Sequence, residues 1–149
     1  MTMTADPFDL DRFVTAQEHT YPVALGEVRN GCKQSHWVWF ILPQLRGLGF
    51  SQMAHKFGIS GMAEAQAYMA HPVLGPRLVE VVQAMLQHQA SSAEDVLGSI
   101  DARKFQSCLT LFALAAPQVA CFNEALQQFF SSQRCALTLK LLAQPPHGA

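Results

Sequence analysis

Residues 73–89 read Val-Leu-Gly-Pro-Arg-Leu-Val-Glu-Val-Val-Gln-Ala-Met-Leu-Gln-His-Gln, with apolar side chains recurring every three or four positions. This spacing puts one set of side chains on a single face of an amphipathic helix, namely Leu74, Leu78, Val81, Val82 and Met85. Helical periodicity continues on both sides of the segment, and the alternation typical of strands is absent. The sequence therefore predicts an all-α fold, a single compact and irregular bundle of about seven to eight helices.

The N-terminal half carries residues that can cap helices in front of apolar runs. Expected helices follow the caps Asp9, Thr20, Ser51 and Ser60. The second of these helices ends at Asn30-Gly31 and has Pro22 in its first turn, where proline is tolerated. The run Trp37–Leu42 stops at Pro43 and is either a buried helical turn or a strand, because periodicity does not decide over so short a length.

The C-terminal half continues the helical pattern. A short turn is expected around Glu94–Leu97, a helix capped by Asp101 follows it, and further helices lie after Pro117 and over about Cys135–Ala143. The last residues, Gln144-Pro-Pro-His-Gly-Ala149, are expected to form a frayed tail. No repeat or linker divides the chain, so we expect one domain over residues 1–149 with an ordered core of about 6–143.

Composition limits the class of protein. The 149 residues suit one domain, and charged residues make up 14% of them, against about 25% in a typical globular protein. The longest strongly apolar stretch, Trp37–Leu42, is too short to cross a bilayer, and residues 1–6 do not resemble a secretory signal. We therefore expect a cytoplasmic protein without membrane contact, whose apolar surface is covered by a second copy in a homodimer.

Cysteine and histidine spacing favours neither a metal site nor a cofactor. The 4 cysteines form no CxxC pair, and the 6 histidines form no HxxxH or HExxH motif. We interpret the thiols as reduced, and we expect no metal and no cofactor. The chain has no GxSxG element, and its glycine-rich segment lacks the ending of a phosphate-binding P-loop.

Charge is distributed unevenly along the chain. Residues 28–63 hold four basic residues and no acidic one, although the whole chain has a formal net charge of −1. The basic residues are Arg29, Lys33, Arg46 and Lys56, and both tryptophans lie in the same window. This pattern favours an anionic ligand in a pocket. It argues against double-stranded nucleic acid, because so few basic residues supply too few phosphate contacts.

The window contains a segment that mixes polar and aromatic side chains, Lys33-Gln-Ser-His-Trp-Val-Trp-Phe-Ile-Leu-Pro-Gln44. Apolar walls with a few polar groups are what a ligand pocket needs. We expect substrate contacts from Lys33, Ser35, Trp37, Trp39 and Gln44, and an acid–base role for His36. The alternative is structural: both tryptophans lie in the core, and His36 caps a carbonyl.

Further candidates lie outside this segment. Arg46 precedes two glycines and an expected helix start, a combination that either holds an anion or forms a plain loop. Asp101 and Lys104 are neighbours on a helix. Either Asp101 is a base and Lys104 clamps an anion, or Asp101 caps the helix and Lys104 is a solvated charge. Gln17 and Tyr21 either donate hydrogen bonds into a pocket or serve the buried face of their helix.

Several blocks of residues carry a family resemblance. They are residues 6–13 (Asp-Pro-Phe-Asp-Leu-Asp-Arg-Phe), 16–17 (Ala-Gln), 31–40 (Gly-Cys-Lys-Gln-Ser-His-Trp-Val-Trp-Phe), 43–49 (Pro-Gln-Leu-Arg-Gly-Leu-Gly), 71–75 (His-Pro-Val-Leu-Gly) and 101–107 (Asp-Ala-Arg-Lys-Phe-Gln-Ser). Together they resemble the bacterial domain-of-unknown-function family numbered 1810, from about Asp6 to Leu142. Members are small, stand-alone and mainly helical, so the resemblance implies a fold and no activity. Some members carry a calpastatin label, which no motif of this chain supports.

The resemblance also bears on the C-terminal half. The family pattern has an acidic residue near the start of the last helix, where this chain has Ala136. If that acid takes part in chemistry, this member is altered or inactive. A fainter resemblance is to the NADAR N-glycosidases, which act on ADP-ribosyl substrates. It rests on the order of Asp101, Lys104-Phe105, a helix and a terminal Thr-Leu segment.

Three functions compete on these observations. The first is an anion-binding enzyme, a hydrolase or N-glycosidase, in which a nucleotide or ADP-ribose-like molecule stacks on a tryptophan of the window. Basic residues would hold its phosphate, and Asp101 or His36 would be the acid–base group. The second is a sensor with the same pocket and no chemistry. The third is an interaction protein, such as a toxin–antitoxin or regulatory component, that acts as a dimer. We favour the first.

Overall fold

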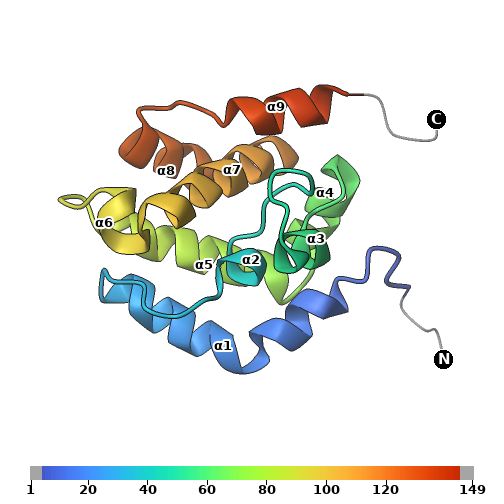
Figure 1. The fold of residues 1–149 in the computed structure, drawn as a ribbon, viewed down its shortest axis with the longest axis horizontal. Helices are drawn as coiled ribbons and strands as arrows, with labels where there is room; N and C mark the ends of the chain where they lie inside the picture. Colours follow the sequence, from blue (N-terminus) through green and yellow to red (C-terminus); the bar gives the residue numbers. More distant parts are fainter. Residues whose placement is uncertain (1–4, 145–149) are drawn as a thin grey trace.

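The computed structural model of the chain describes residues 5–144, and within this range the backbone forms nine helices and no strand. In chain order they are α1 (Asp11–Arg29), α2 (Val38–Ile41), α3 (Gln52–Phe57), α4 (Met62–Ala70), α5 (Leu74–Leu86), α6 (Ala93–Leu97), α7 (Ser99–Ala115), α8 (Cys121–Phe130) and α9 (Ala136–Ala143) (Figure 1). The predicted all-α class is confirmed. The helices outnumber the prediction because short turns such as α6 form helices of their own. Of the predicted tail, residues 145–149 lie outside the described range.

One hydrophobic core joins the helices. Within it α1 packs on α5, and both α8 and α9 pack on α7 (Figure 1). Aromatic rings run through this core from helix to helix. The Phe13 ring of α1 lies edge-on to Tyr68 of α4, with 5.1 Å between ring centroids. Tyr68 lies 5.3 Å from Phe112 of α7, and Phe112 lies 5.9 Å from Phe122 of α8. The apolar face predicted for residues 73–89 is the buried face of α5.

The first helix corrects a prediction. Thr20 does not cap a second helix, because α1 runs without interruption from Asp11 to Arg29 with Pro22 inside it. Proline removes one backbone hydrogen bond and bends a helix, and Figure 1 shows α1 changing direction near its middle. Tyr21 and Leu25 on either side of the proline are buried. Burial of this face keeps the second half of the helix in place despite the lost bond.

Three further helix starts differ from the prediction, and the first is that of α4, whose N-cap residue is Gly61 and not Ser60. Asp9 does not cap α1; it has a positive φ of 52°, and the Asp6 carboxylate instead accepts from the Leu10 and Asp11 amides at 2.8 and 3.0 Å. These backbone bonds lower the pKa of Asp6. Asp101 does not cap α7, because that helix begins at Ser99 and Asp101 lies in its first turn. Its carboxylate instead pairs with the side chains of Lys33 and Lys104.

The predicted start of α3 is confirmed. The Ser51 hydroxyl accepts from the Ala54 amide at 3.1 Å, and the helix ends at Gly58 as predicted. Just beyond it, Ile59 pairs with Leu45 in an isolated parallel bridge, in which the Arg46 amide donates to the Ile59 carbonyl at 2.8 Å. The bridge fixes the loop after α2 against the end of α3, and so positions the residues on either side of it.

Candidate functional site

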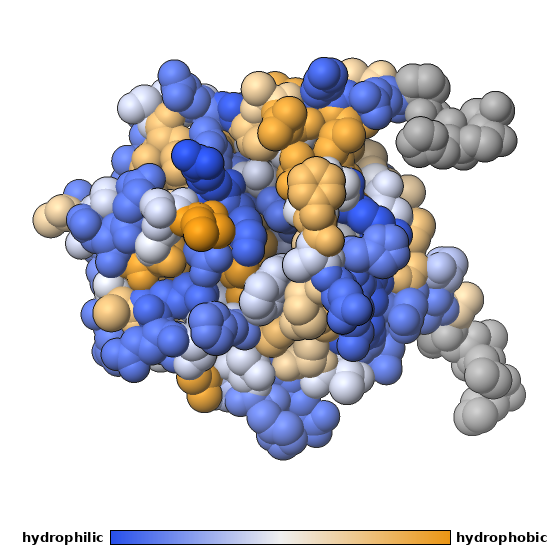
Figure 2. Space-filling view, viewed as in Figure 1, coloured by the Kyte–Doolittle hydropathy of each residue, from blue (hydrophilic) through white to orange (hydrophobic). Residues whose placement is uncertain are grey.

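A cleft of about 460 Å³ opens between the segment before α2 and the start of α7. Figure 2 shows the face on which it lies, hollowed near its centre. Its walls come from residues 33–39 and 97–104, which are far apart in the sequence. They are Lys33, Gln34, His36, Val38, Trp39, Leu97, Gly98, Ser99, Ile100, Asp101 and Lys104. Five of the residues predicted for a site therefore meet here: Lys33, His36, Trp39, Asp101 and Lys104.

Glu27 of α1 shapes the segment that forms one wall. Its carboxylate accepts from the Ser35 hydroxyl at 2.6 Å, from the Gln34 and Ser35 amides at 2.8 and 2.9 Å, and from the Trp37 indole at 2.9 Å. Burial alone would raise the pKa of Glu27, but these hydrogen bonds outweigh it and lower the pKa to about 2. Ser35 and Trp37 are thus held by the protein itself, and Trp37 is fully buried.

The Lys33 ammonium is enclosed at the bottom of the cleft. Its side chain is 8% exposed, its Nζ lies 2.8 Å from an Asp101 oxygen, and it also donates to the Ser35 carbonyl. The ammonium lies over the Trp37 ring, 5.0 Å from the centroid, where the electron-rich face attracts a cation. Lys33 is therefore a fixed positive charge that joins the loop to α7.

The Lys104 ammonium is held more loosely. It lies 3.6 Å from the other Asp101 oxygen, and its side chain is 24% exposed against 17% for Asp101. It also lies over the Trp39 ring, 5.1 Å from the centroid. Unlike Trp37, Trp39 is partly exposed and lines the cleft. One carboxylate thus lies between two ammonium groups, and the outer ammonium also covers an aromatic face.

The start of α7 adds partial positive charge to the cleft. Gly98 adopts a φ of +85°, which glycine tolerates, and this turns the chain from α6 into α7. The Ala102 amide donates to the Gly98 carbonyl at 2.9 Å, and no side chain caps the helix. The amides ahead of Ala102 have no acceptor within the helix, so this 17-residue helix presents free N–H groups and its positive dipole end at the cleft.

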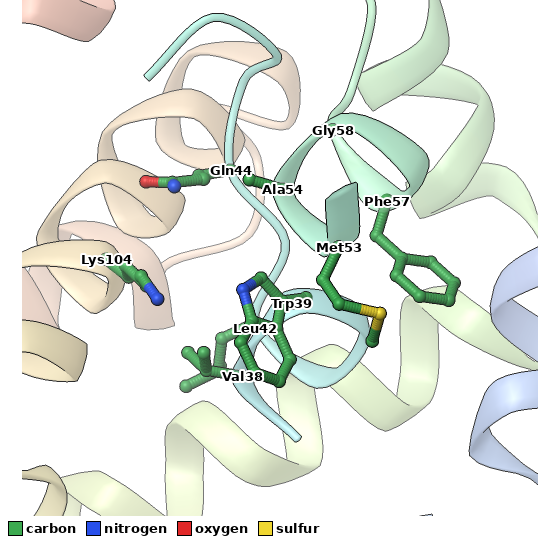
Figure 3. A pocket seen from close by; sticks show the side chains of 9 residues that line it. All are labelled: Val38, Trp39, Leu42, Gln44, Met53, Ala54, Phe57, Gly58 and Lys104. Carbon is green, nitrogen blue, oxygen red and sulfur yellow. The ribbon is translucent and has the colours of Figure 1, made fainter. Parts of the chain in front are cut away.

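A small apolar pit adjoins the cleft (Figure 3). It holds about 10 Å³, roughly the space of one water molecule, and shares Val38, Trp39 and Lys104 with the cleft. In Figure 3 Met53 lies beside the Trp39 indole, and Gln44 and Lys104 lie on the other side of the pit. The structure gives no hydrogen bond for the Gln44 side chain within residues 5–144. Gln44 lines the pit but not the cleft itself.

Six predicted site residues do not line the cleft: Ser35 and Trp37 are bonded to Glu27, Gln44 lines only the pit, and Gln17, Tyr21 and Arg46 lie elsewhere. Gln17 is buried and donates to the Phe40 carbonyl at 2.7 Å, while Tyr21 donates to the Glu80 carboxylate. Arg46 is exposed and donates to the His55 carbonyl at 3.0 Å. None of the three lines the cleft. Ala136 is the exposed first residue of α9 and does not line it either.

The sequence prediction missed Glu27 and Glu64, which stand immediately before and after the main basic window. Glu64 of α4 is buried and lies 2.7 Å from the Arg12 guanidinium, which also donates to the Gly58 carbonyl at 3.1 Å. The signal that could have found them is their position: two acids bracket a stretch with none. Buried acids need donors, and the stretch between them supplies several.

Two features are absent from the described part of the chain. Among residues 5–144, no group of three or more His, Cys, Asp or Glu side chains is arranged to hold a metal ion. In the same range no helix has both the length and the apolar character required to cross a bilayer.

Comparison with known proteins places this fold. A family described as a protein of unknown function (DUF1810) matches residues 7–142. The chain belongs to this family. A structure of the conserved hypothetical protein Rv1873 from Mycobacterium tuberculosis is 44% identical to the chain, with a TM-score of 0.92. The similarity covers 94% of this chain and 100% of that one. No curated protein matches the chain. Neither description names a ligand or a reaction.

Proposed function

We propose that the chain binds an anionic small molecule of the nucleotide or ADP-ribose type in the cleft between residues 33–39 and the start of α7. The proposal rests on four features that line the same cleft. Lys33, Lys104, a helix start without a side-chain cap and the partly exposed Trp39 line one cleft of about 460 Å³. Phosphate groups favour helix N-termini and ammonium groups, and aromatic faces favour planar rings.

Lys104 is the residue we assign to clamp the phosphate. Its 3.6 Å contact with Asp101 is long, and its side chain is the more exposed of the two lysines. A phosphate oxygen that approaches the start of α7 can replace Asp101 as its partner at little cost. Lys33 would keep its 2.8 Å contact with Asp101 and act through its charge. The Asp101 oxygen released by Lys104 could then accept a hydrogen bond from a ligand hydroxyl group.

Trp39 is the residue we assign to hold a planar ring. In the free protein the Lys104 ammonium covers one face of the indole. When Lys104 turns to a phosphate, that face becomes open for stacking. The Gln44 amide at the adjoining pit has both donor and acceptor atoms for the edge of a ring. Phosphate binding and ring binding would therefore be coupled through a single lysine.

Hydrolysis is the reaction class we assign to this site if the protein is an enzyme. His36 is exposed at the cleft and Asp101 lies within it, so either can exchange a proton with water or with a leaving group. Asp101→Asn and His36→Ala, combined with product analysis on a bound ligand, separate enzyme from sensor. A ligand that binds and is returned unchanged identifies the non-catalytic sensor.

The test is a thermal-shift panel of NAD, ADP-ribose, nucleotides and sugar phosphates. A ligand at 100 times its dissociation constant stabilises a protein by about 2.7 kcal/mol, which is readily measured. We expect a shift with at least one of these molecules, reduced at least tenfold in affinity in Lys104→Gln. Lys140→Gln, an exposed lysine on α9, is the matched control and should bind as the wild type does. No shift with any molecule of the panel contradicts the proposal.

A second function has an observation of its own. The Phe50 side chain is 98% exposed, and Leu137 and Leu139 of α9 are exposed as well. Hydrophobic side chains gather over α9 at the top of Figure 2. Exposed apolar groups of this kind favour contact with another protein, in the simplest case a second copy. Light scattering tests this function: a dimer that Phe50→Ser dissociates supports it, and a monomer at high concentration contradicts it.

We also propose a cytoplasmic location. All four cysteines, Cys32, Cys108, Cys121 and Cys135, are free thiols in the structure. Free thiols are the usual state of cysteine in a reducing compartment.

A further inference from the structure

One cysteine lies in an environment unlike that of the other three. Cys135 is the N-cap residue of α9, with extended backbone angles, and is only partly buried. Its amide donates to the Thr110 hydroxyl of α7 at 2.9 Å, and its sulfur lies 3.2 Å from the Ser107 hydroxyl of the same helix. The sulfur is therefore located between the first turn of α9 and a row of hydroxyl groups on α7.

The Ser107 hydroxyl has one proton and two acceptors within reach. It lies 3.1 Å from the Arg103 carbonyl and 3.2 Å from the Cys135 sulfur. When Cys135 is a thiol, the serine can donate to the carbonyl and accept from S–H. When the sulfur is a thiolate, the serine can turn its proton to the sulfur. This site accommodates both states of the sulfur.

A fully buried hydroxyl beside the sulfur has no partner. Thr138 is 0% exposed, and its Oγ1 makes no hydrogen bond within the described residues. Thr138 is the third residue of α9, a position from which a side chain reaches back toward the N-cap residue. The amide that it would meet there, that of Cys135, is already bonded to Thr110. The Thr138 hydroxyl is instead close enough to the Cys135 sulfur to lower its pKa.

An unpartnered buried hydroxyl is costly and indicates an unfilled position. An oxygen atom bonded to the Cys135 sulfur would give the Thr138 hydroxyl an acceptor. We propose that Cys135 is a redox modification site, at which hydrogen peroxide oxidises the sulfur to a sulfenic acid stabilised by Thr138 and Ser107.

The chemistry balances with peroxide as the oxidant. The thiolate attacks one oxygen of hydrogen peroxide, an S–O bond forms and the O–O bond breaks. Two electrons pass from sulfur to peroxide, and the departing hydroxide takes up a proton to become water. The product oxygen is an acceptor for the Thr138 hydroxyl, while Ser107 remains beside the sulfur.

The state of the thiols agrees with this assignment. Partial burial acts to raise the pKa of Cys135, but the Ser107 hydrogen bond, the nearby Thr138 hydroxyl and the first amides of α9 outweigh it and lower that pKa. Burial raises the pKa of Cys121 to about 11, and it raises the pKa of the fully buried Cys108 further. The thiolate is the reactive form, so Cys135 should react before these two. Cys32 is exposed, which makes it the internal reference.

The experiment uses the full-length protein with hydrogen peroxide and dimedone, which traps sulfenic acids, followed by peptide mapping by mass spectrometry. We expect labelling of Cys135 at a rate at least about tenfold above that of Cys32. Thr138→Val, which keeps the shape of the side chain and removes the hydroxyl, should reduce the yield of trapped sulfenic acid at least threefold. Its folding should be unaffected, because the hydroxyl has no partner to lose.

Two controls keep the result interpretable. Ser107→Ala should slow the oxidation of Cys135 and leave Cys32 unchanged. Cys32→Ser should leave Cys135 labelling as it is in the wild type. The proposal is overturned if Cys32 is labelled as fast as Cys135 in the folded protein. It is equally overturned if Cys135 is labelled only after denaturation, or if Thr138→Val folds normally and labels as the wild type does.

Discussion

The Lys33 ammonium lies 2.8 Å from the Asp101 carboxylate, across residues that are far apart in the chain. This contact ties the loop after α1 to the start of α7, and it lies at the bottom of the candidate cleft. The same carboxylate contacts Lys104, so a single side chain links the enclosed ammonium of Lys33 with the more exposed ammonium of Lys104. Stability and the proposed ligand binding therefore meet at Asp101, and substitutions at and around this residue separate the two.

Asp101→Asn should destabilise the fold, because it leaves the enclosed Lys33 ammonium without its carboxylate. The Ser35 carbonyl and the Trp37 ring remain as partners, so we expect a loss of about 2 kcal/mol, below the range for a fully buried pair. Urea unfolding measures it. The matched control is Glu94→Gln, an exposed acid of α6, which should stay within about 0.5 kcal/mol of the wild type. Equal stability of the two variants would show that the ion pair of Lys33 and Asp101 does not stabilise the fold.

Glu27 should make stability depend on acid pH. Hydrogen bonds lower the pKa of Glu27 in the folded state from 4.5 to about 2. A folded pKa below the unfolded one stabilises the fold fully above pH 4.5, and this contribution is lost as the pH falls toward 2. Urea unfolding of the wild type between pH 6 and pH 2.5 should show that loss.

Glu27→Gln should remove that part of the pH dependence and cost about 1.5 to 3 kcal/mol at neutral pH, the usual value of hydrogen bonds to a charged group. A variant with the same acid profile as the wild type would show that Glu27 is not the group responsible.

Arg12 and Arg46 should differ sharply in their effect on stability. Arg12 forms a buried ion pair with Glu64 and donates to several carbonyls, whereas Arg46 is exposed with one side-chain hydrogen bond. We expect a loss of about 3 to 5 kcal/mol for Arg12→Ala and less than about 1 kcal/mol for Arg46→Ala. Thermal unfolding of both variants in one buffer compares them. Similar losses would contradict the structural assignment of Arg12.

Gly58 and Gly26 offer a matched pair of alanine substitutions. A Cβ at Gly58 would lie 2.7 Å from the Arg46 Cα, so the bridge that fixes the pit must shift. A Cβ at Gly26, inside α1, would meet nothing within 4 Å. Gly58→Ala should destabilise by about 1 to 3 kcal/mol, and Gly26→Ala should stabilise by up to about 1 kcal/mol. Circular dichroism melts measure both changes, and an opposite order would contradict the packing described around Gly58.

Local signals in the sequence predict much of the fold. The buried face of α5 and the limits of α3 at Ser51 and Gly58 follow from periodicity and capping within a few residues. The continuity of α1 does not, because Pro22 and Thr20 indicate a break that burial of Tyr21 and Leu25 overrides. Packing against the core decides whether this helix continues past the proline, and a short stretch of sequence does not contain that information.

The sequence predicts the candidate site only in part, because tertiary packing also decides which of its residues come together. The basic aromatic window supplies Lys33, His36 and Trp39, and the helix starting near Asp101 supplies Lys104, but only the fold brings them together. Gln17 has the polarity expected of a site residue, yet it bonds to the Phe40 carbonyl and to Tyr68. Whether a buried amide serves a ligand or a neighbouring carbonyl depends on contacts across the core, and residue type alone does not decide it.

The most direct measurement is an NMR titration of the two tryptophan indole N–H signals with ADP-ribose, assigned with Trp39→Phe. Trp37 donates to Glu27 in the core, whereas Trp39 lines the cleft under the Lys104 ammonium. We predict that the Trp39 signal shifts saturably and more than the Trp37 signal, and that Lys104→Gln needs at least tenfold more ligand. If neither signal moves at millimolar ADP-ribose, nucleotide or sugar phosphate, or if Lys104→Gln titrates as the wild type does, the cleft is not the anion site.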